Sequence, residues 1–258
     1  MGKLLLDSGI PGPAGPNLLL TLLWASQANT LPAAFWCVAF LILPQNKRYV
    51  KVMQESAASS SSGNNGELLH RIIHQACDPK SLLVRCCHEA IRLRSPSIDI
   101  RIAASNIVVP LSSNRRIGIG KGSIVALSPW ISNLDSRFYK APHTYDPDRE
   151  SIHLPHPVAG IQGIPGLSFG GGVYRCPGRS FAAMELAVLV GILIAKFDFR
   201  IATEGDVYVG KSTRADRSCF PGDPQSLLPP PDLRRLVGIK VPVGPCVVEC
   251  TSRTRGAD

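Results

Sequence analysis

The sequence predicts a mainly α-helical fold that also contains small β-sheets, an α+β arrangement. Two segments, 17–43 and 180–196, are long enough and apolar enough to form packed helices. Short runs rich in Ile and Val, separated by Ser, Asn and Gly, predict strands. The chain has 258 residues, of which 45% are hydrophobic and 18% charged, so a packed globular protein is expected and disorder throughout is excluded.

The run from Asn17 to Leu43 contains no charged residue. Pro16 favours a helix start before it, and Pro44 ends it. Its length would span a bilayer, so a transmembrane helix is one interpretation, testable by resistance to carbonate extraction. A polar cluster in mid-run, followed by Pro32, instead favours a long helix buried in the protein with a polar notch facing a cavity. The cluster consists of Ser26, Gln27, Asn29 and Thr30.

The remaining elements follow from apolar spacing and turn residues. Helices are expected at 45–56, 67–76, 78–93 and 180–196, the third of them opened by Asp78 and Pro79. Strands are expected at 98–102, 107–109, 124–127 and 197–201. Segments 59–66 and 142–172 are rich in Ser, Gly or Pro and predict loops. Beyond Gly210 the pattern weakens, and Pro229–Pro231 excludes regular structure.

Charge and cysteine content narrow the classes of partner. The net charge is +9, but Lys and Arg are scattered and not interleaved with aromatic residues, which argues against nucleic acid. A basic face that receives an acidic electron donor fits this charge better. The eight cysteines form no CxxC pair, so a zinc site is not expected. Their thiols are expected to be reduced and to face the cytosol.

A glycine-rich loop that contains Cys176 carries the strongest signal for chemistry. It reads Phe-Gly-Gly-Gly-Val-Tyr-Arg-Cys-Pro-Gly-Arg over residues 169–179 and leads into the helix expected at 180–196. Glycines let the backbone turn sharply and approach a flat cofactor. The helix N-terminus stabilises a thiolate, and a thiolate ligand promotes cleavage of the O–O bond at an iron centre.

This loop resembles the cytochrome P-450 signature Phe-x-x-Gly-x-x-x-Cys-x-Gly, which Phe169, Gly172, Cys176 and Gly178 meet. The resemblance implies haem b as cofactor, with Cys176 as the axial ligand of the iron. Many family members place a basic residue two positions before the cysteine, where this chain has Tyr174. Arg175, one residue later, is expected to serve a haem propionate instead. Arg101, in an expected strand, matches a family position that commonly pairs with a propionate.

Two further motifs resemble the same family. Glu89 and Arg92 stand three apart on one face of a helix and match its Glu-x-x-Arg motif. Pro142, Tyr145 and Arg149 match the meander Pro-x-x-Phe-x-x-x-Arg, with Tyr in place of Phe. The resemblance implies a structural role: a desolvated network of one carboxylate and two guanidinium groups that holds the haem loop.

The polar notch resembles the long oxygen-binding helix of the family. Thr30 takes the alcohol position that hydrogen-bonds dioxygen and helps to deliver protons, and Asn29 replaces the usual acid. Both are expected to be catalytic. Ser26 replaces the usual glycine, and this variant is most similar to the branch of cholesterol 7α-hydroxylase, related sterol hydroxylases and prostacyclin synthase.

The resemblance runs from about residue 18 to about residue 201 and covers the C-terminal half of a typical family member. A single, partial domain is therefore expected, with five parts: an oxygen-binding helix at 17–43, a Glu-x-x-Arg helix at 78–93, a meander at 142–149, the cysteine loop and helix at 169–196, and a divergent tail at 210–258. The walls of the haem pocket that the other half of a typical family member supplies would be missing, and apolar surface would be exposed there. The chain alone is therefore expected to bind haem poorly.

Function is expected at two levels. The family implies a monooxygenase that hydroxylates a sterol-like or other lipophilic molecule with O2 and electrons from an NADPH-dependent reductase, on the cytosolic face of the endoplasmic reticulum membrane. Association with that membrane is expected of the full-length relative. A non-catalytic remnant of such an enzyme and an isomerase of the prostacyclin synthase type remain as alternatives. Thr30 favours hydroxylation.

Overall fold

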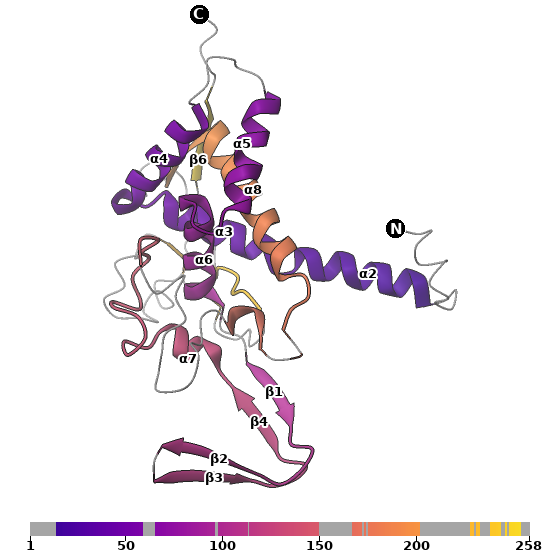
Figure 1. The fold of residues 1–258 in the computed structure, drawn as a ribbon. Helices are drawn as coiled ribbons and strands as arrows, with labels where there is room; N and C mark the ends of the chain where they lie inside the picture. Colours follow the sequence, from indigo (N-terminus) through magenta and orange to yellow (C-terminus); the bar gives the residue numbers. More distant parts are fainter. Residues whose placement is uncertain are drawn as a thin grey trace, which may run out of the picture.

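A computed structural model confirms the mainly helical fold with small β-sheets (Figure 1). It describes residues 14–58, 65–95, 98–112, 114–149, 167–171, 173, 175–201, 228–229, 231–232, 238–243, 246 and 248–253. The helices are α2 (Ala14–Gln27), α3 (Thr30–Leu41), α4 (Lys47–Ala58), α5 (Asn65–Cys77), α6 (Leu82–Arg94), α7 (Pro129–Asn133) and α8 (Arg179–Lys196). Two short 3-10 helices, η1 (Pro44–Asn46) and η3 (Leu167–Phe169), precede α4 and the cysteine loop.

The strands form three antiparallel ribbons of two strands each among the described residues. They pair β1 (Asp99–Ile102) with β4 (Ile124–Leu127), β2 (Ile107–Ser112) with β3 (Arg115–Ile119), and β5 (Phe197–Ile201) with β6 (Val248–Ser252). The register places Ile100 opposite Ala126, and Phe199 opposite Cys250. Strand β3 was not predicted because it is exposed over four of its five residues and begins with two arginines, so it lacks an apolar alternation.

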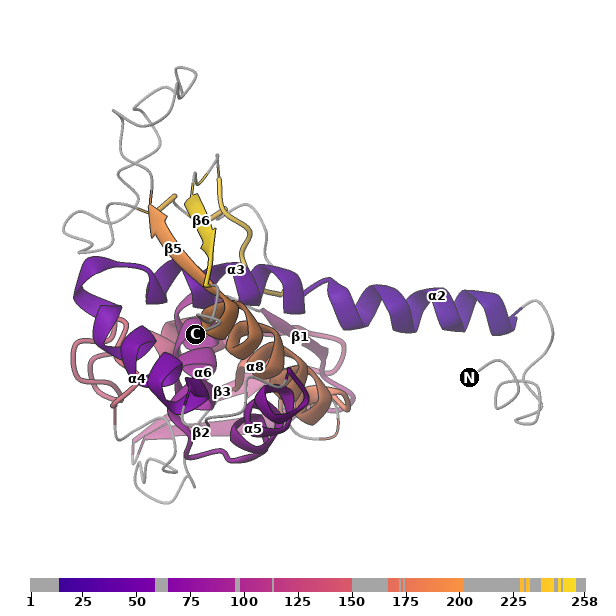
Figure 2. The same ribbon diagram turned by 90° about the horizontal axis from the view of Figure 1, so that it is seen from above.

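The core lies where α3 crosses α6 and α8, and α4 and α5 also pack against α8 (Figure 2). Trp36 and Phe40 of α3, Cys86 of α6, and Leu186 and Val190 of α8 are all fully or almost fully buried. Burial of each large apolar side chain contributes about 1.5–3 kcal/mol to stability. These contacts bring segments from the beginning, middle and end of the chain into one cluster.

The long uncharged run forms two helices rather than one. It is interrupted at Ala28 and Asn29, and α3 starts at Thr30. Pro32 explains the position of the break, because in a continuous helix its ring would clash with the carbonyl of Ala28, four residues earlier. In the observed structure Pro32 lies in the first turn of α3, where its missing N–H costs nothing.

Only the second half of this run is buried. Eight of the twelve residues of α3 are buried, whereas α2 has no buried residue and projects from the rest of the molecule (Figures 1 and 2). The expectation of a helix buried along its whole length is therefore wrong for α2. Among the described residues no single helix is both long and apolar enough to cross a bilayer. Only Ala14–Leu41 taken with Pro44–Ala58, bent by 85°, meets the length and composition.

Helix α6 begins three residues later than Asp78 and Pro79 suggest. The Asp78 carboxylate accepts a hydrogen bond from the Lys80 amide (2.9 Å), so Asp78 forms a turn rather than a helix cap. Ser81 is the N-cap, and its hydroxyl accepts a hydrogen bond from the Val84 amide (3.2 Å).

Candidate functional site

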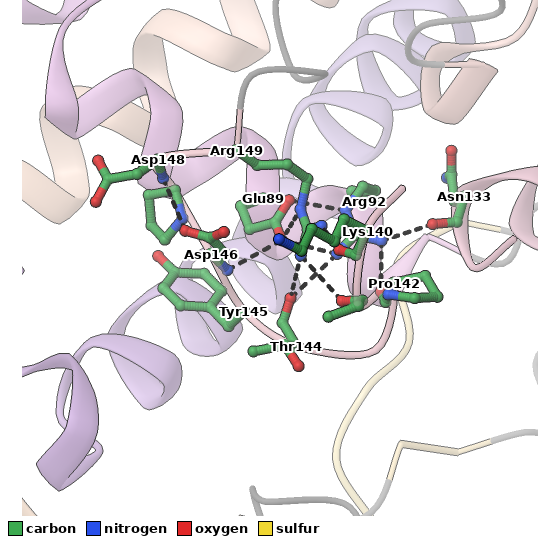
Figure 3. A network of polar contacts seen from close by, with 12 residues as sticks. Glu89, Arg92, Asn133, Lys140, Pro142, Thr144, Tyr145, Asp146, Asp148 and Arg149 are labelled. Carbon is green, nitrogen blue, oxygen red and sulfur yellow. Dashed lines mark hydrogen bonds and ion pairs between the residues drawn. The ribbon is translucent and has the colours of Figure 1, made fainter. Parts of the chain in front are cut away.

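A single buried carboxylate, Glu89 of α6, lies at the centre of a polar network (Figure 3). Its two oxygens accept hydrogen bonds from Arg92 Nη2 and Nε, each at 2.7 Å, in a bidentate pair. Oε1 also accepts from Arg149 Nε (3.3 Å) and from the backbone amide of Asp146 (3.1 Å). The structure thus brings together the three residues that the sequence assigned to one cluster. All three are at least 93% buried.

The remaining donors of the two arginines bind backbone carbonyls of the meander and of its approach. Arg92 donates to the carbonyls of Asn133 (2.6 Å) and Pro142 (2.7 Å). Arg149 donates to the carbonyls of Lys140, Ala141 and Thr144, the last at 2.9 Å. Because a guanidinium group has five donors in a fixed plane, it can fix a loop that has no secondary structure of its own.

Two buried tyrosines flank this network. The ring of Tyr139 lies 4.8 Å below the Arg92 guanidinium, and burial raises the pKa of its hydroxyl. Tyr145 stacks on Phe40 of α3 with a centroid separation of 4.7 Å and donates a hydrogen bond to the Cys86 carbonyl (3.1 Å). Burial raises its pKa well above the ordinary value. Tyr145 therefore fills the aromatic position of the meander and adds a hydrogen bond that Phe lacks.

The cysteine loop closes on itself just before α8. The Cys176 amide donates to the Phe169 carbonyl (2.8 Å), and the Cys176 carbonyl accepts from the Arg179 side chain (3.1 Å). Gly170 has a φ of +74°, which glycine adopts without strain. Gly178 is the N-cap of α8, and a Cβ there would lie 3.9 Å from the Cys176 sulfur. Gly172 lies outside the described residues.

These features fit a thiolate ligand. Cys176 is a free, half-buried thiol at the N-terminus of an 18-residue helix, where the helix dipole and the amides favour negative charge. Phe169 is half-buried and packs against the core, so the loop is anchored at one end by an apolar contact. A haem would be held here by Cys176, with Gly178 leaving space beside the sulfur.

Thr30 is buried and connects two helices through its hydroxyl. Its Oγ1 lies 2.8 Å from the Ser26 carbonyl oxygen and 3.3 Å from Oε2 of Glu185 on α8. Asn29 is exposed, and its Oδ1 accepts a hydrogen bond from the Ile239 amide (2.9 Å) in the C-terminal tail. The two residues expected to be catalytic therefore differ: Thr30 faces a carboxyl group, whereas the Asn29 side chain binds the tail.

The two arginines expected to bind propionates lie on β1 and beside the cysteine. Arg101 is half-buried on β1, and its guanidinium donates to the Ile100 carbonyl (2.8 Å). Arg175 is exposed next to the cysteine. That these two residues bind the haem propionates stays a prediction.

Several residues of the site were not predicted from sequence. Glu185 of α8 was not predicted, because nothing in its spacing points to Thr30, which is 155 positions away. In the tail, the Lys240 carbonyl accepts a hydrogen bond from the Trp36 indole, and the Lys240 amide donates to the Arg94 carbonyl. Burial lowers the pKa of the Lys240 ammonium. The divergent tail therefore contacts both α3 and α6.

With this geometry in place, comparisons with known proteins define the class. A family model for cytochrome P450 matches residues 17–212, more than half of the chain. The chain belongs to the cytochrome P450 family, and this membership implies a haem iron cofactor.

Similar curated proteins include sterol-metabolising members of the family. The chain is 26% identical over 247 residues to 24-hydroxycholesterol 7-alpha-hydroxylase from Mus musculus, which covers 92% of this chain and 44% of the relative. It is 30% identical to cytochrome P450 7A1 from Sus scrofa, covering 71% of this chain and 38% of the relative. It is also 30% identical to obtusifoliol 14-alpha demethylase from Triticum aestivum, covering 72% and 40% respectively. The chain spans less than half the length of these relatives.

Proposed function

We propose that this chain forms the haem-thiolate half of a monooxygenase that hydroxylates a sterol-like or other lipophilic small molecule. Haem b would be bound by Cys176 and would supply the oxygen-activating iron. Electrons would come from an NADPH-dependent reductase, and the protein would lie on the cytosolic face of the endoplasmic reticulum membrane. The similarity to proteins named as sterol hydroxylases and demethylases supports the substrate class.

The observation that carries this proposal is the convergence of three separate segments on one core. The start of α3 supplies Thr30, α6 supplies Glu89, and α8 begins directly after the Cys176 loop. All three helices pack against one another. Thr30 keeps the hydroxyl at this position, and insertion of one oxygen atom needs delivered protons, which rearrangement of a peroxide does not. This favours hydroxylation over isomerisation.

A non-catalytic remnant is the second candidate, and the exposure of α2 favours it. Leu20, Leu23 and Trp24 are 66%, 58% and 69% exposed, although they belong to the run that resembles the oxygen-binding helix. No other described residue covers these three side chains. In this candidate the chain keeps the packed core but does not hold haem firmly.

The reduced carbon monoxide difference spectrum of the chain, expressed with haem supplied, separates the two candidates. Monooxygenase function predicts a Soret band at the red position typical of thiolate ligation, lost in Cys176→Ala and kept in Cys77→Ala. Cys77 is a matched control because it is also a free thiol, but an exposed one on α5. Absence of haem uptake would assign this chain to the remnant class.

A further inference from the structure

Helix α2 carries apolar side chains around most of its circumference. Its five leucines and Trp24 cover an arc of about 240°, given the pitch of an α-helix. Asn17 and Thr21 lie one turn apart in the narrow strip that remains. A helix that faces water ordinarily has charged residues on its outer side, and α2 has no charged residue on any side. Water is therefore a poor surrounding for this helix.

The hydroxyl groups of α2 are satisfied by the helix itself. Thr21 Oγ1 donates to the Asn17 carbonyl at 2.8 Å, and Ser26 Oγ donates to the Leu23 carbonyl at 2.8 Å. Lipid acyl chains offer no hydrogen-bond partners, so a segment that enters them must satisfy its polar groups internally. These two bonds lower the cost of moving α2 out of water.

A second copy of the chain covers α2 less well than a bilayer does. A helix of 14 residues is about 21 Å long and, with side chains, about 10 Å wide. Two such helices side by side bury roughly 400 Å² in total, whereas a stable interface needs about 1,000 Å² or more. Contact between two copies through α2 alone is therefore weak. Acyl chains, in contrast, surround the whole apolar arc at once.

Charge and length agree with insertion into one leaflet. The sequence from Ser8 to Gln54 contains neither Asp nor Glu, and the chain carries a net charge of +9, which complements anionic headgroups. A length of about 21 Å is shorter than the hydrocarbon core of a bilayer, which is about 30 Å thick. Trp24 lies at the edge of the apolar arc beside Asn17, and tryptophan prefers the level of the headgroups.

We propose that α2 inserts into one leaflet of a lipid bilayer and is the element by which this chain contacts a membrane. The leucines face the acyl chains, and the strip of Asn17 and Thr21 faces the headgroups. The inference rests on the membrane location in the proposed function and not on the binding of haem. Because α2 projects from the rest of the molecule, it can enter a leaflet while the packed core stays in water (Figures 1 and 2).

Binding is tested by co-sedimentation of the full chain with vesicles of phosphatidylcholine, alone or mixed with phosphatidylserine. We expect binding to both, and tighter binding to the mixed vesicles at low salt, because headgroup charge adds to the burial of the leucines. Replacing Leu20, Leu23 and Trp24 by serine should weaken binding to both at least about 100-fold, since each large apolar side chain contributes about tenfold or more.

The control variant replaces three equally exposed isoleucines by serine. Ile102, Ile124 and Ile131 are 71%, 73% and 68% exposed but lie on β1, β4 and α7. This variant should bind vesicles nearly as well as the parent chain, and circular dichroism should show that both variants are folded. An equal loss of binding in the two variants would overturn the proposal, because vesicles would then adsorb any exposed apolar side chain.

The depth of insertion is measured through Trp24. Its emission is the difference between the parent chain and Trp24→Phe, and it is quenched by bromine atoms placed at different depths in the acyl chains. We expect stronger quenching by bromine near the headgroup end of the chains than near the bilayer centre. Stronger quenching at the centre would overturn the placement of α2 in one leaflet.

The remaining outcomes separate this proposal from its alternatives. A stable dimer that dissociates in the α2 variant, together with no binding to vesicles, would overturn the proposal and assign α2 to a second copy. Vesicle binding is measured on the chain without haem. Absence of haem uptake would therefore overturn the monooxygenase function alone, whereas absence of vesicle binding would overturn the role of α2 and leave the carbon monoxide spectrum as it is.

Discussion

At the scale of single residues, Glu89 determines the electrostatics of the protein's centre. One carboxylate lies between two guanidinium groups, so the cluster carries one excess positive charge in a buried place. Backbone carbonyls of residues 133–144 surround that charge with the negative ends of their dipoles. Removal of a buried charge partner is therefore expected to cost far more than removal of an exposed one.

Glu89→Gln tests this difference. The variant leaves two buried guanidinium groups without a counter-charge, and we expect the free energy of unfolding to fall by about 3–5 kcal/mol. Glu249→Gln is the matched control, because Glu249 forms a 2.6 Å pair with Arg200 that is exposed on both sides. That exchange should cost about 0–1 kcal/mol. Equal losses in urea denaturation would contradict the assignment of Glu89 to a desolvated network.

Because of Tyr145, the free energy of unfolding is expected to fall at alkaline pH. Its ordinary pKa is 10.0 and burial raises it in the folded protein, so the unfolded chain loses this proton first as the pH rises. The contribution to stability is complete below pH 10 and is lost above it. Tyr145→Phe removes the hydrogen bond to the Cys86 carbonyl, at about 1 kcal/mol near neutral pH. It should also flatten the alkaline fall in unfolding free energy, measured by denaturation up to about pH 11. An unchanged slope would contradict this account.

At the scale of elements, a short piece of the tail is held by three contacts: to the N-cap of α3, to α3 itself and to the end of α6. Ile239 binds Asn29, and Lys240 binds both Trp36 of α3 and Arg94 of α6. Gly238, with a φ of +78°, turns the chain into this position, and a Cβ there would lie 2.2 Å from Asn29 Oδ1. The tail therefore closes over the break between α2 and α3.

Gly238→Ala is predicted to open this contact. Alanine at positive φ costs about 1–2 kcal/mol, and displacement of the flexible Asn29 side chain loses about 1 kcal/mol more with the bond to Ile239. Gly122→Ala is the matched control, because Gly122 has a φ of +83° but open space around its Cα. Thermal unfolding should show the larger loss for Gly238. Adding Asn29→Ala to Gly238→Ala should cost nothing further, and a full additional loss would show that the contact had survived.

Local patterns in the sequence predict part of these elements well. The apolar pattern gives strand β5 and helix α8 to within one residue, and the Glu-x-x-Arg spacing places the carboxylate and guanidinium of one helix face together. The break before Thr30 combines a proline effect with a tail contact that lies 210 residues away, and only the proline is visible in the sequence. Asp78 and Ser81 are both good caps, and the choice between them depends on how α6 packs. Glu185 was not predicted for the same reason. Its contact with Thr30 depends on how α3 and α8 cross, and not on the spacing of the two residues in the sequence.

At the scale of the whole molecule, apolar surface is distributed unevenly. It is concentrated on α2, on the ribbon of β2 and β3, and on the ribbon of β1 and β4, where Ile102 and Ile124, directly opposite each other, are 71% and 73% exposed. Extended apolar surface of this kind promotes association in water. The charged residues of the core network cannot offset it, because they are buried.

Replacing Leu20, Leu23 and Trp24 by serine should reduce self-association without loss of stability. All three side chains lie on α2, which has no buried residue, so their removal exposes no cavity. Light scattering should report a smaller mass at the same concentration, with an unfolding midpoint close to that of the parent chain. Leu186→Ser is the contrasting control: Leu186 is 1% exposed in the core, and this variant should unfold. Stability lost in the α2 variant would contradict the solvent-facing position of this helix.

The contact between Asn29 and Ile239 also concerns synthesis on the ribosome. Its two partners are separated by 210 residues, and the Trp36 contact to Lys240 by 204. At about 5–20 residues per second, roughly 10–40 s pass between the appearance of α3 and that of its last partner. During this interval α3, the most apolar helix of the core, has been synthesised but lacks its contacts with the tail. We therefore expect α3 to need protection from association until residues 239 and 240 have emerged.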